Sequence, residues 1–320
     1  MTVQEDFQAL AALLNERILG QPALIDRLLI ALLADGHLLV EGAPGLAKTQ
    51  AVKELARYVE ADFHRIQFTP DLLPADLTGS DVFRPETSTF EFQRGPLFHH
   101  LLLADEINRA PAKVQAALLE AMAERQISIG QNTWPLDELF LVMATQNPIE
   151  QEGTYPLPEA QLDRFLMQVF VDYPDARTER DILALARRRE RGGSGTASLH
   201  LSRASVLAAR QGVTDVFLSP AVEEYLIELI LATRGLSRYG EQHRRHLRYG
   251  ASPRGTIALD RCARAHAWLA GRDYVTPEDI RTLAPDVLRH RLLLTFEAEA
   301  DGLHPDRIVQ DLLQEIPVSV

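Results

Sequence analysis

The segment from residue 42 to residue 49 has the residue types of a phosphate-binding loop. It consists of Gly42-Ala43-Pro44-Gly45-Leu46-Ala47-Lys48-Thr49. It follows a short apolar run and precedes the helical pattern Gln50–Tyr58, so backbone N–H groups and the helix macrodipole can converge on an anion. There Lys48 would reach the β- and γ-phosphates of a nucleotide, and the Thr49 hydroxyl would bind Mg²⁺. The alternative is an ordinary glycine-containing turn, and Ala47 departs from the second glycine that the usual pattern places before the lysine.

Two adjacent carboxylates follow another apolar run. Asp105 and Glu106 come directly after Leu101–Ala104, which places both acids at the carboxyl end of a predicted strand. Ligands of open α/β sheets bind at that edge. Asp105 would hold Mg²⁺ directly or through water, and Glu106 would polarise the attacking water. The alternative is that the pair only caps the following segment, since Pro111 begins a helix soon after.

A third apolar run, Leu139–Ala144, is followed by Thr145-Gln146-Asn147-Pro148. At the same sheet edge, Asn147 could hydrogen-bond the γ-phosphate and the attacking water together. An asparagine before a proline is also a common turn former. The assignment of Asn147 therefore depends on the two motifs upstream of it.

A parallel sheet is needed to bring these motifs together, and the hydropathy pattern predicts one in the first half of the chain. Five apolar runs of strand length alternate with helical patterns; they are Leu38–Val40, Phe63–Phe68, Leu101–Ala104, Leu139–Ala144 and Phe165–Val171. Nearly continuous apolar strands separated by helices indicate a doubly wound α/β sheet that is covered on both faces. We expect the sheet to end near Asp172–Pro174 and an arginine-rich helix to follow over Asp175–Arg191.

The second half of the chain is predicted to be a small all-helical domain. The stretch Gly192-Gly193-Ser194-Gly195-Thr196 is typical of a flexible hinge. Beyond it no strand pattern is convincing, and helices are predicted at Pro220–Thr233, Arg254–Ala270 and Pro277–His290; two of these follow a Ser-Pro or Thr-Pro start signal. The predicted division is a core over 1–191, a hinge over 192–200 and a helical domain over 201–320.

Composition narrows the class of protein. The 320 residues include 33 basic and 45 acidic side chains, a net charge of −12, which opposes a general nucleic-acid-binding coat. Cys262 is the only cysteine, so a disulfide framework and a cysteine-based zinc site are excluded and a reducing compartment is favoured. No run approaches the ~18 apolar residues of a membrane span, and the acidic N-terminus is unlike a secretory signal. We expect a cytoplasmic protein.

With these motifs in place, the sequence resembles the AAA+ ATPases, and more narrowly the MoxR family, over nearly its whole length. The resemblance implies a P-loop NTPase fold, with a doubly wound parallel sheet core followed by a small all-helical lid. It is carried by the Pro44/Ala47 form of the loop and by five runs: Ile18-Leu19-Gly20-Gln21, Leu103-Ala104-Asp105-Glu106-Ile107-Asn108-Arg109-Ala110-Pro111, Ala144-Thr145-Gln146-Asn147-Pro148, Glu152-Gly153-Thr154-Tyr155-Pro156-Leu157-Pro158-Glu159-Ala160-Gln161-Leu162-Asp163-Arg164-Phe165 and Ser252-Pro253-Arg254-Gly255.

The resemblance also implies roles that spacing alone does not show. Asn147 resembles the sensor 1 residue, Arg164 the arginine finger lent to a neighbouring subunit's nucleotide, and Arg254 the sensor 2 arginine of the lid. From the residues alone, an ion pair with Asp163 or Glu159 would be the preferred explanation of Arg164. Catalysis is thereby assigned to Lys48, Glu106, Asn147, Arg164 and Arg254, nucleotide contact to Gly20, Gln21, Gly42, Ala43, Pro44, Gly45, Leu46, Ala47, Lys48, Thr49 and Gln50, and Mg²⁺ binding to Thr49 and Asp105.

Two insertions are implied in the same way. Residues 69–95 resemble the helix 2 insertion of this clade, and residues 127–135 resemble the hairpin that precedes sensor 1. Both face the ring pore in relatives. The arginine-rich stretch over residues 234–248 contrasts with the acidic net charge of the chain, and it is either a solvated loop or a contact for a neighbouring subunit, an acidic partner or a phosphate.

By this resemblance we expect Mg²⁺-dependent hydrolysis of ATP by a homo-oligomeric ring, with a hexamer the expected form. Such a ring would remodel or mature protein clients in a chaperone-like way, together with a partner that carries a von Willebrand factor A domain. One alternative is a nucleotide-gated scaffold with little turnover, which the intact Glu106 and Arg164 oppose. The other is a DNA-remodelling motor, which the acidic net charge opposes.

Overall fold

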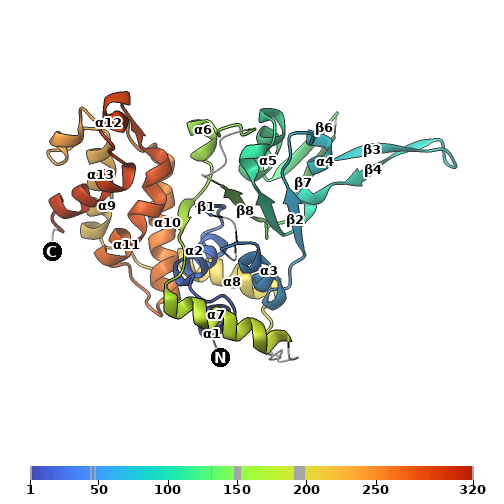
Figure 1. The fold of residues 1–320 in the computed structure, drawn as a ribbon, viewed down its shortest axis with the longest axis horizontal. Coiled ribbons are helices and arrows are strands. Elements are labelled where there is room, and N and C mark those ends of the chain that lie inside the picture. The colour runs from blue at the N-terminus through green and yellow to red at the C-terminus, as the bar shows by residue number, and fades with distance from the viewer. Residues whose placement is uncertain are drawn as a thin grey trace.

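The computed structural model describes residues 2–43, 45–46, 48–130, 132–147, 153–190 and 199–318. The predicted contacts of Pro44 and Ala47, and most of the predicted hinge over 192–200, lie outside the described residues. Figure 1 shows a sheet domain with helices around it and a helical bundle beside it, with a long hairpin standing out at the opposite end. None of the described helices combines the length and the apolar composition that a membrane crossing needs.

The core is a five-stranded parallel sheet, as the hydropathy pattern predicts. Its strands lie in the order β2-β5-β8-β1-β9, and each pairs with its neighbours in parallel. The sheet is doubly wound because β1 lies inside it, between β8 and β9. The strands are β1 (Leu38–Gly42), β2 (Phe63–Gln67), β5 (Leu101–Asp105), β8 (Leu141–Gln146) and β9 (Met167–Val171).

The strand β2 differs from its prediction as a continuous apolar run. Only Ile66 of its five residues is buried. The reason is its position at the edge of the sheet, where one side of the strand is left open to solvent. Edge strands commonly carry charged and polar side chains, and here the polar residues reach the candidate site described below.

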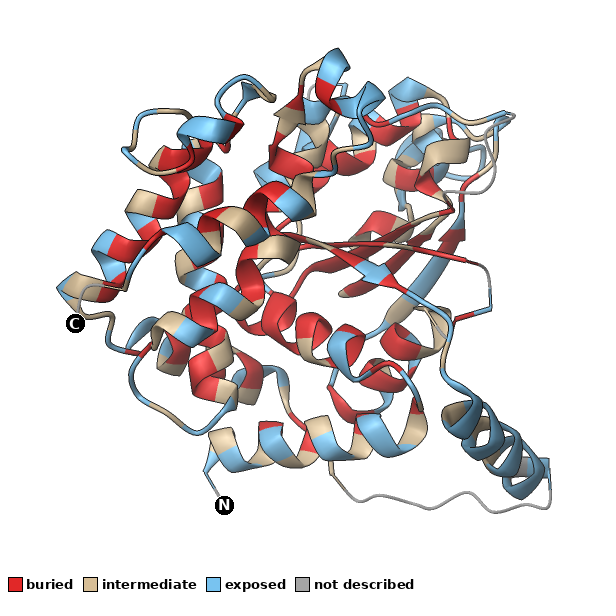
Figure 2. Cartoon of the chain, turned by 60° about the vertical axis from the view of Figure 1, so that its left-hand side comes forward, coloured by how far each residue is buried: buried red, intermediate tan, exposed pale blue. Residues whose placement is uncertain are grey.

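Both faces of the sheet are buried, and alternate residues of each central strand point to opposite layers. Leu38 and Val40 belong to the cluster that includes the packed faces of α1 (Val3–Arg17), α2 (Pro22–Leu33) and α3 (Lys48–Tyr58). Leu39, between them, belongs to a second cluster with α5 (Ala112–Glu124). Figure 2 shows the resulting layers of buried residues on either side of the sheet.

In the described residues beyond β9, the regular structure is helical apart from one short two-stranded sheet, β10–β11, which is too short for a hydropathy pattern to reveal. Ser202, Ser219 and Ser252 cap α8, α9 and α10, because their side chains accept backbone N–H groups of the first turn. The predicted Ser219-Pro220 signal thus marks a true helix start. The elements are α7 (Ala176–Glu190), α8 (Arg203–Thr214), α9 (Pro220–Thr233), β10 (Leu247–Tyr249), α10 (Pro253–Leu269), α11 (Pro277–Leu288), β11 (Leu293–Leu294), α12 (Phe296–Ala300) and α13 (Pro305–Glu315), with short 3-10 turns at Glu241–His243 and Arg289–Arg291.

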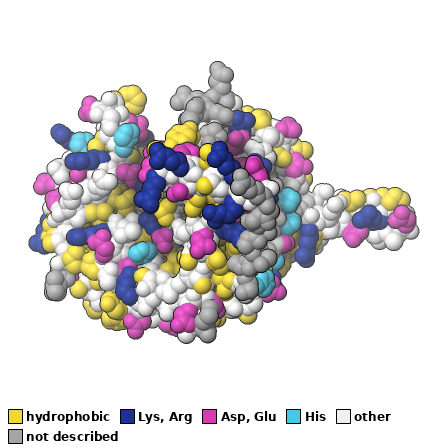
Figure 3. Space-filling view, turned by 60° about the horizontal axis from the view of Figure 1, so that its bottom comes forward, with side chains coloured by type: hydrophobic (Ala, Val, Ile, Leu, Met, Phe, Trp, Pro, Cys, Tyr) yellow, Lys and Arg dark blue, Asp and Glu magenta, His cyan; other side chains and the backbone are white. Residues whose placement is uncertain are grey.

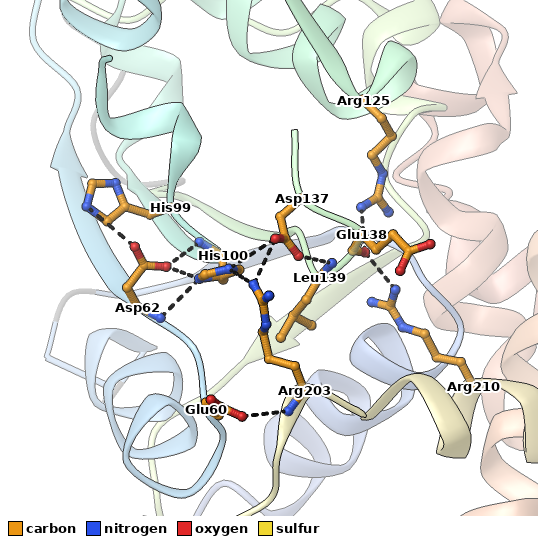
Figure 4. Close-up of polar contacts among 10 residues, drawn as sticks. All are labelled: Glu60, Asp62, His99, His100, Arg125, Asp137, Glu138, Leu139, Arg203 and Arg210. Atoms are coloured by element: carbon orange, nitrogen blue, oxygen red, sulfur yellow. Dashed lines mark hydrogen bonds and ion pairs between the residues drawn. The ribbon is translucent and has the colours of Figure 1, made fainter. Parts of the chain in front are cut away.

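Helix α8 is attached to the sheet at the edge where the strands begin. Arg203 donates to Asp137 at 2.8 Å, and Arg210 donates to the carbonyl oxygen of Glu138 at 2.9 Å. Asp137 and Glu138 lead into β8, and Figure 4 shows both arginines reaching up from α8 to this segment. The same cluster holds His100 in contact with Asp62 and Arg203. His100 therefore makes structural contacts, and the described residues contain no group that could hold a metal ion through three or more side chains of His, Cys, Asp or Glu.

Two hairpins extend from the core where the insertions are predicted. The longer one consists of β3 (Gly79–Arg84) and β4 (Thr89–Arg94), follows the short α4 (Pro74–Thr78), and stands clear of the molecule with apolar side chains along it (Figure 3). The shorter one consists of β6 (Gln126–Ile129) and β7 (Asn132–Pro135). The ring of Phe92 stacks on that of Trp134, with centroids 4.1 Å apart. The two hairpins are thus clamped together at their bases.

Candidate nucleotide-binding site

A cavity of about 390 Å³ lies at the carboxyl ends of β1, β5 and β8. Residues from all three sequence motifs line it, together with one side chain from the edge strand β2. The structure therefore brings the loop, the acidic pair and Asn147 to one place, as the parallel sheet requires. The lining residues are Gly45, Leu46, Lys48, Thr49, Gln50, Arg65, Asp105, Glu106, Thr145, Gln146 and Asn147.

The loop leaves β1 at a point where only glycine fits. A Cβ atom on Gly42 would lie 2.4 Å from the carbonyl oxygen of Val171 on the adjoining strand, far inside van der Waals contact. Gly45 has a positive φ of 85°, the left-handed conformation that glycine adopts without strain. Both positions allow the chain to turn sharply from strand to helix, and α3 then begins at Lys48.

Among the described residues that line this cavity, Lys48 carries the only ammonium group. Its Nζ donates to the carbonyl oxygen of Gly42 at 2.7 Å. Burial lowers the pKa of Lys48, and the carboxylates of Asp105 and Glu106 offset part of that effect. A phosphate group would supply stronger acceptors than the Gly42 carbonyl, since hydrogen bonds between ionised partners are roughly twice as strong as neutral ones.

Thr145 links the two members of the acidic pair. Its hydroxyl donates to Oδ1 of Asp105 at 2.6 Å and accepts the backbone N–H of Glu106 at 2.9 Å. Glu106 has a positive φ of 58°, a conformation that is costly for a residue with a side chain and is typical of functional sites. Glu106 makes no side-chain capping hydrogen bond to the turn that follows, Ile107–Arg109. The geometry thus favours a positioned acid pair over a simple cap.

The edge strand β2 supplies contacts that the sequence motifs do not predict. Arg65 donates to Oδ2 of Asp105 at 2.6 Å. Gln67 donates to Oε2 of Glu106 at 2.8 Å, and the guanidinium of Arg109 lies 3.1 Å from the same oxygen. Arg65 and Gln67 are two residues apart, so they lie on one face of the strand. This spacing of two residues could have indicated that both side chains reach the same site. The apolar residues Phe63, Ile66 and Phe68 dominate the hydropathy pattern of the segment, however, and predict only a buried strand.

The residues predicted to hold Mg²⁺ fit that ion. Thr49 and Asp105 line the same cavity and offer the hard oxygen donors that Mg²⁺ prefers. Two protein ligands suffice for an ion that keeps several waters and binds through one or two carboxylates plus substrate phosphates.

A second cavity of about 250 Å³ adjoins the first and shares Gly45, Leu46 and Gln50 with it. The other residues that line this second cavity come from the connection between α1 and α2 and from α7. Most of these residues are apolar, which suits the flat base of a nucleotide. Gln21 lines it and donates to the carbonyl oxygen of Asp172 at 3.1 Å. Gly20 does not line this second cavity; it packs closely against the side chain of Thr178 in α7. The remaining lining residues are Arg17, Ile18, Leu19, Pro174, Glu179, Ile182, Leu185 and Ala186.

Arg164 and Arg254 lie elsewhere, in a separate hollow of about 390 Å³. Arg164 comes three residues before Met167, which pairs with Leu38 at the start of β1, whereas the phosphate loop follows Gly42 at the end of β1. At a rise of about 3.3 Å per residue, the four intervening steps separate the two sheet edges by about 13 Å. Neither arginine reaches the phosphate cavity of its own chain.

The ion pair that offered an alternative explanation of Arg164 is not formed among the described residues. Asp163 instead accepts Arg291 at 2.8 Å and the hydroxyl of Ser252 at 2.8 Å. The Arg164 guanidinium donates to the carbonyl oxygen of Leu119 at 2.6 Å.

The sheet order, the glycine loop and the acidic pair define a P-loop nucleotide-binding protein with a helical lid. The family profile described as "ATPase family associated with various cellular activities (AAA)" matches residues 37–167, and the profile "AAA lid domain" matches residues 241–312. The chain is 46% identical over 300 residues to "Chaperone MoxR1" of Mycobacterium tuberculosis, which covers 93% of this chain and 78% of that protein. It is 42% identical over 324 residues to YeaC of Bacillus subtilis, which covers 100% of this chain and 98% of that protein.

A crystal structure from Cytophaga hutchinsonii, described there as a candidate ATPase, superposes with a TM-score of 0.90 at 45% identity and covers 99% of this chain and 96% of that one. The chain belongs to the MoxR family of AAA+ ATPases. The family and the fold class that the sequence motifs predict are thereby confirmed.

Proposed function

We propose that this chain hydrolyses ATP with Mg²⁺ and does so only when assembled with further copies of itself. The observation that supports this most is the single cavity that gathers Lys48, Thr49, Asp105, Glu106 and Asn147 at one sheet edge. Phosphoryl transfer needs little besides positioning and stabilisation of charge, and these residue types supply both.

The roles follow from position in the cavity. Lys48 and the N–H groups at the start of α3 bind the phosphates, while Thr49 and Asp105 hold the metal ion. When bound, Mg²⁺ would neutralise part of the charge on the β- and γ-phosphate oxygens. Glu106 orients the attacking water and takes its proton, and Asn147 hydrogen-bonds the γ-phosphate.

Arg164 acts on the nucleotide of a neighbouring copy, because it lies about 13 Å along the sheet from its own cavity, by the rise of a strand. Hydrolysis then depends on assembly, since an arginine finger is worth ~10³–10⁵ in rate in comparable enzymes. Arg254 occupies the same hollow, so it too would meet the neighbour's phosphates and couple the lid to the nucleotide state. We propose a hexameric ring.

The work done by the ring is proposed to be the remodelling or maturation of protein clients, with a von Willebrand factor A domain protein as partner. A relative named as a chaperone supports the first part, and the second part rests on the family resemblance. The lone cysteine, which is buried, fits a cytoplasmic location.

Two variants test the cavity. Lys48→Ala should abolish ATP binding, while Glu106→Gln should keep binding and lose turnover. Lys53→Ala, an exposed change on the same helix, is the matched control and should behave as the unmodified chain. Turnover that is equal in all four proteins would show that this cavity is not the catalytic site, and nucleotide binding without turnover in the unmodified chain would favour the scaffold alternative.

A mixture of two inactive variants tests whether Arg164 is donated from one copy of the chain to the next. Arg164→Ala should bind ATP without turnover, and mixing it with Glu106→Gln should restore part of the activity, because each variant completes the site that the other lacks. Absence of rescue in rings shown to contain both variants would contradict donation across the interface.

A further inference from the structure

The hollow that holds Arg164 and Arg254 is unusually rich in positive charge for a chain with a net charge of −12. Five arginines and two aspartates line it: Arg125, Arg164, Arg254, Arg261, Arg291, Asp35 and Asp163. We call this feature the arginine hollow.

Both carboxylates of the arginine hollow are already neutralised. Asp35 accepts Arg125 at 2.5 Å and also Arg210 at 2.8 Å. Asp163 is bound by Arg291, which is itself buried. His37 also lines the hollow, and burial lowers its pKa to about 3, so it is neutral at physiological pH.

Three guanidinium groups therefore remain without a carboxylate partner. Arg164 contacts a backbone carbonyl. In the part of the chain that the structure describes, the side chains of Arg254 and Arg261 form no hydrogen bond or ion pair. Asp260 precedes Arg261 but is paired with Arg264 at 2.8 Å on another face of the helix. The excess is about three positive charges in one concave site, which repel one another until an anion enters.

Helix α10 holds two of these groups rigidly. Arg254 and Arg261 are seven residues apart, so they lie on the same face, about 10 Å apart along the helix axis. The opposite face is fixed in the core by Leu259, Cys262 and Ala263, all fully buried. Ser252 caps the helix and also binds Asp163, the residue before Arg164. This cap ties the helix to the segment that carries the predicted finger.

We propose that Arg261 is a third phosphate-binding arginine, which together with Arg164 and Arg254 contacts the polyphosphate of ATP held by a second copy of this chain. The proposal rests on the proposed function above. A polyphosphate suits the site because guanidinium groups donate in a planar fork that matches phosphate oxygens, and because the hollow is concave. The chain's own phosphate cavity opens at the opposite sheet edge, so the ligand must come with another copy.

The test compares Arg261→Ala with Arg261→Lys and with Arg307→Ala, a matched change at an exposed arginine of α13, outside the hollow. Arg261→Ala should leave ATP binding and ring assembly unchanged and lower the turnover at saturating ATP about 10- to 100-fold, the range for loss of a hydrogen bond to a charged group. Arg261→Lys should retain part of the turnover that Arg261→Ala loses. Arg307→Ala should leave ATP binding, assembly and turnover unchanged.

A mixture of two variants tests whether Arg261 contacts the nucleotide of a neighbouring copy. Arg261→Ala combined with Lys48→Ala should regain turnover, because the Lys48→Ala copies still lend an intact Arg261 to their neighbours. If Arg261→Ala turns over normally while Arg164→Ala is inactive, this proposal is wrong and the proposed function stands. Loss of assembly with and without nucleotide would show that Arg261 binds an acidic surface of the neighbour instead, which also overturns the proposal, as does absence of rescue in the mixture.

Discussion

His37 makes the stability of this protein depend on pH in a way that can be calculated from its contacts. Its side chain is buried just before β1. Nδ1 accepts the backbone N–H of Val142 at 3.1 Å, and Nε2 donates to the carbonyl oxygen of Met122 at 3.3 Å. Both ring nitrogens are therefore in use in the neutral form, and a proton on Nδ1 would face an N–H donor. Burial, and to a lesser degree the charge of Arg125, lowers the pKa of His37 from 6.5 to about 3.

The sign of the pH effect depends on which state, unfolded or folded, binds a proton on His37 at the higher pH. The unfolded chain takes up a proton on His37 near pH 6.5, whereas the folded chain does so near pH 3. Stability from this residue is complete above pH 6.5 and falls as the pH drops from 6.5 towards 3. At 1.36 kcal/mol per pH unit, the whole difference is worth about 5 kcal/mol, and about 2 kcal/mol of it is lost between about pH 7.5 and about pH 5.

The measurement is the free energy of unfolding by urea at these two pH values for the unmodified chain and for His37→Gln. Glutamine keeps an amide that can accept and donate but does not titrate. We expect the unmodified chain to lose about 2 kcal/mol more than His37→Gln on acidification. His200→Gln, at an exposed site, is the control and should follow the unmodified chain. Equal losses in the unmodified chain and His37→Gln, within about 0.5 kcal/mol, would refute the reasoning.

Three further predictions concern the site and the lid. Thr145→Val should lower the turnover about tenfold with little change in ATP binding, because the N–H of Glu106 loses its acceptor; unchanged turnover would mean that the hydroxyl bridge is incidental. Asp279→Ala should lower the free energy of unfolding by about 3–5 kcal/mol, because Asp279 is 1% exposed and its loss removes the hydrogen bonds that it accepts from Arg272 and from Thr276 at the start of α11; urea denaturation checks this, and a loss below about 1 kcal/mol would contradict it. Removal of divalent cations with EDTA should abolish turnover and added Mg²⁺ should restore it, whereas activity that persists in EDTA would exclude a role for Thr49 as a metal ligand.

Local sequence information was sufficient for the parts of the site that lie within single motifs. The buried strands β1, β5 and β8 are marked by apolar runs; β5 and β8 end in polar residues that line the cavity, and β1 leads into the phosphate loop. Parallel strands share a carboxyl edge, so three motifs distant in sequence could be placed together without coordinates. The strand β2 was predicted from its apolar residues, but its place at the open edge of the sheet was not, and the contacts of Arg65 and Gln67 with the acidic pair were therefore missed.

The sequence by itself determined the sheet, the phosphate loop, the acidic pair and the family, because hydrophobic periodicity and short motifs act over a few residues. Only the tertiary structure decided which charges face one another. In the folded chain, the Thr145 hydroxyl donates to Asp105 of the acidic pair. Asp163 pairs with Arg291 and not with Arg164. Arg254 and Arg261 line the same hollow as Arg164, the predicted arginine finger. These pairings depend on packing between segments that lie 40 to 128 residues apart in the chain, since an ion pair is selected by burial and distance and leaves no periodic mark along the chain.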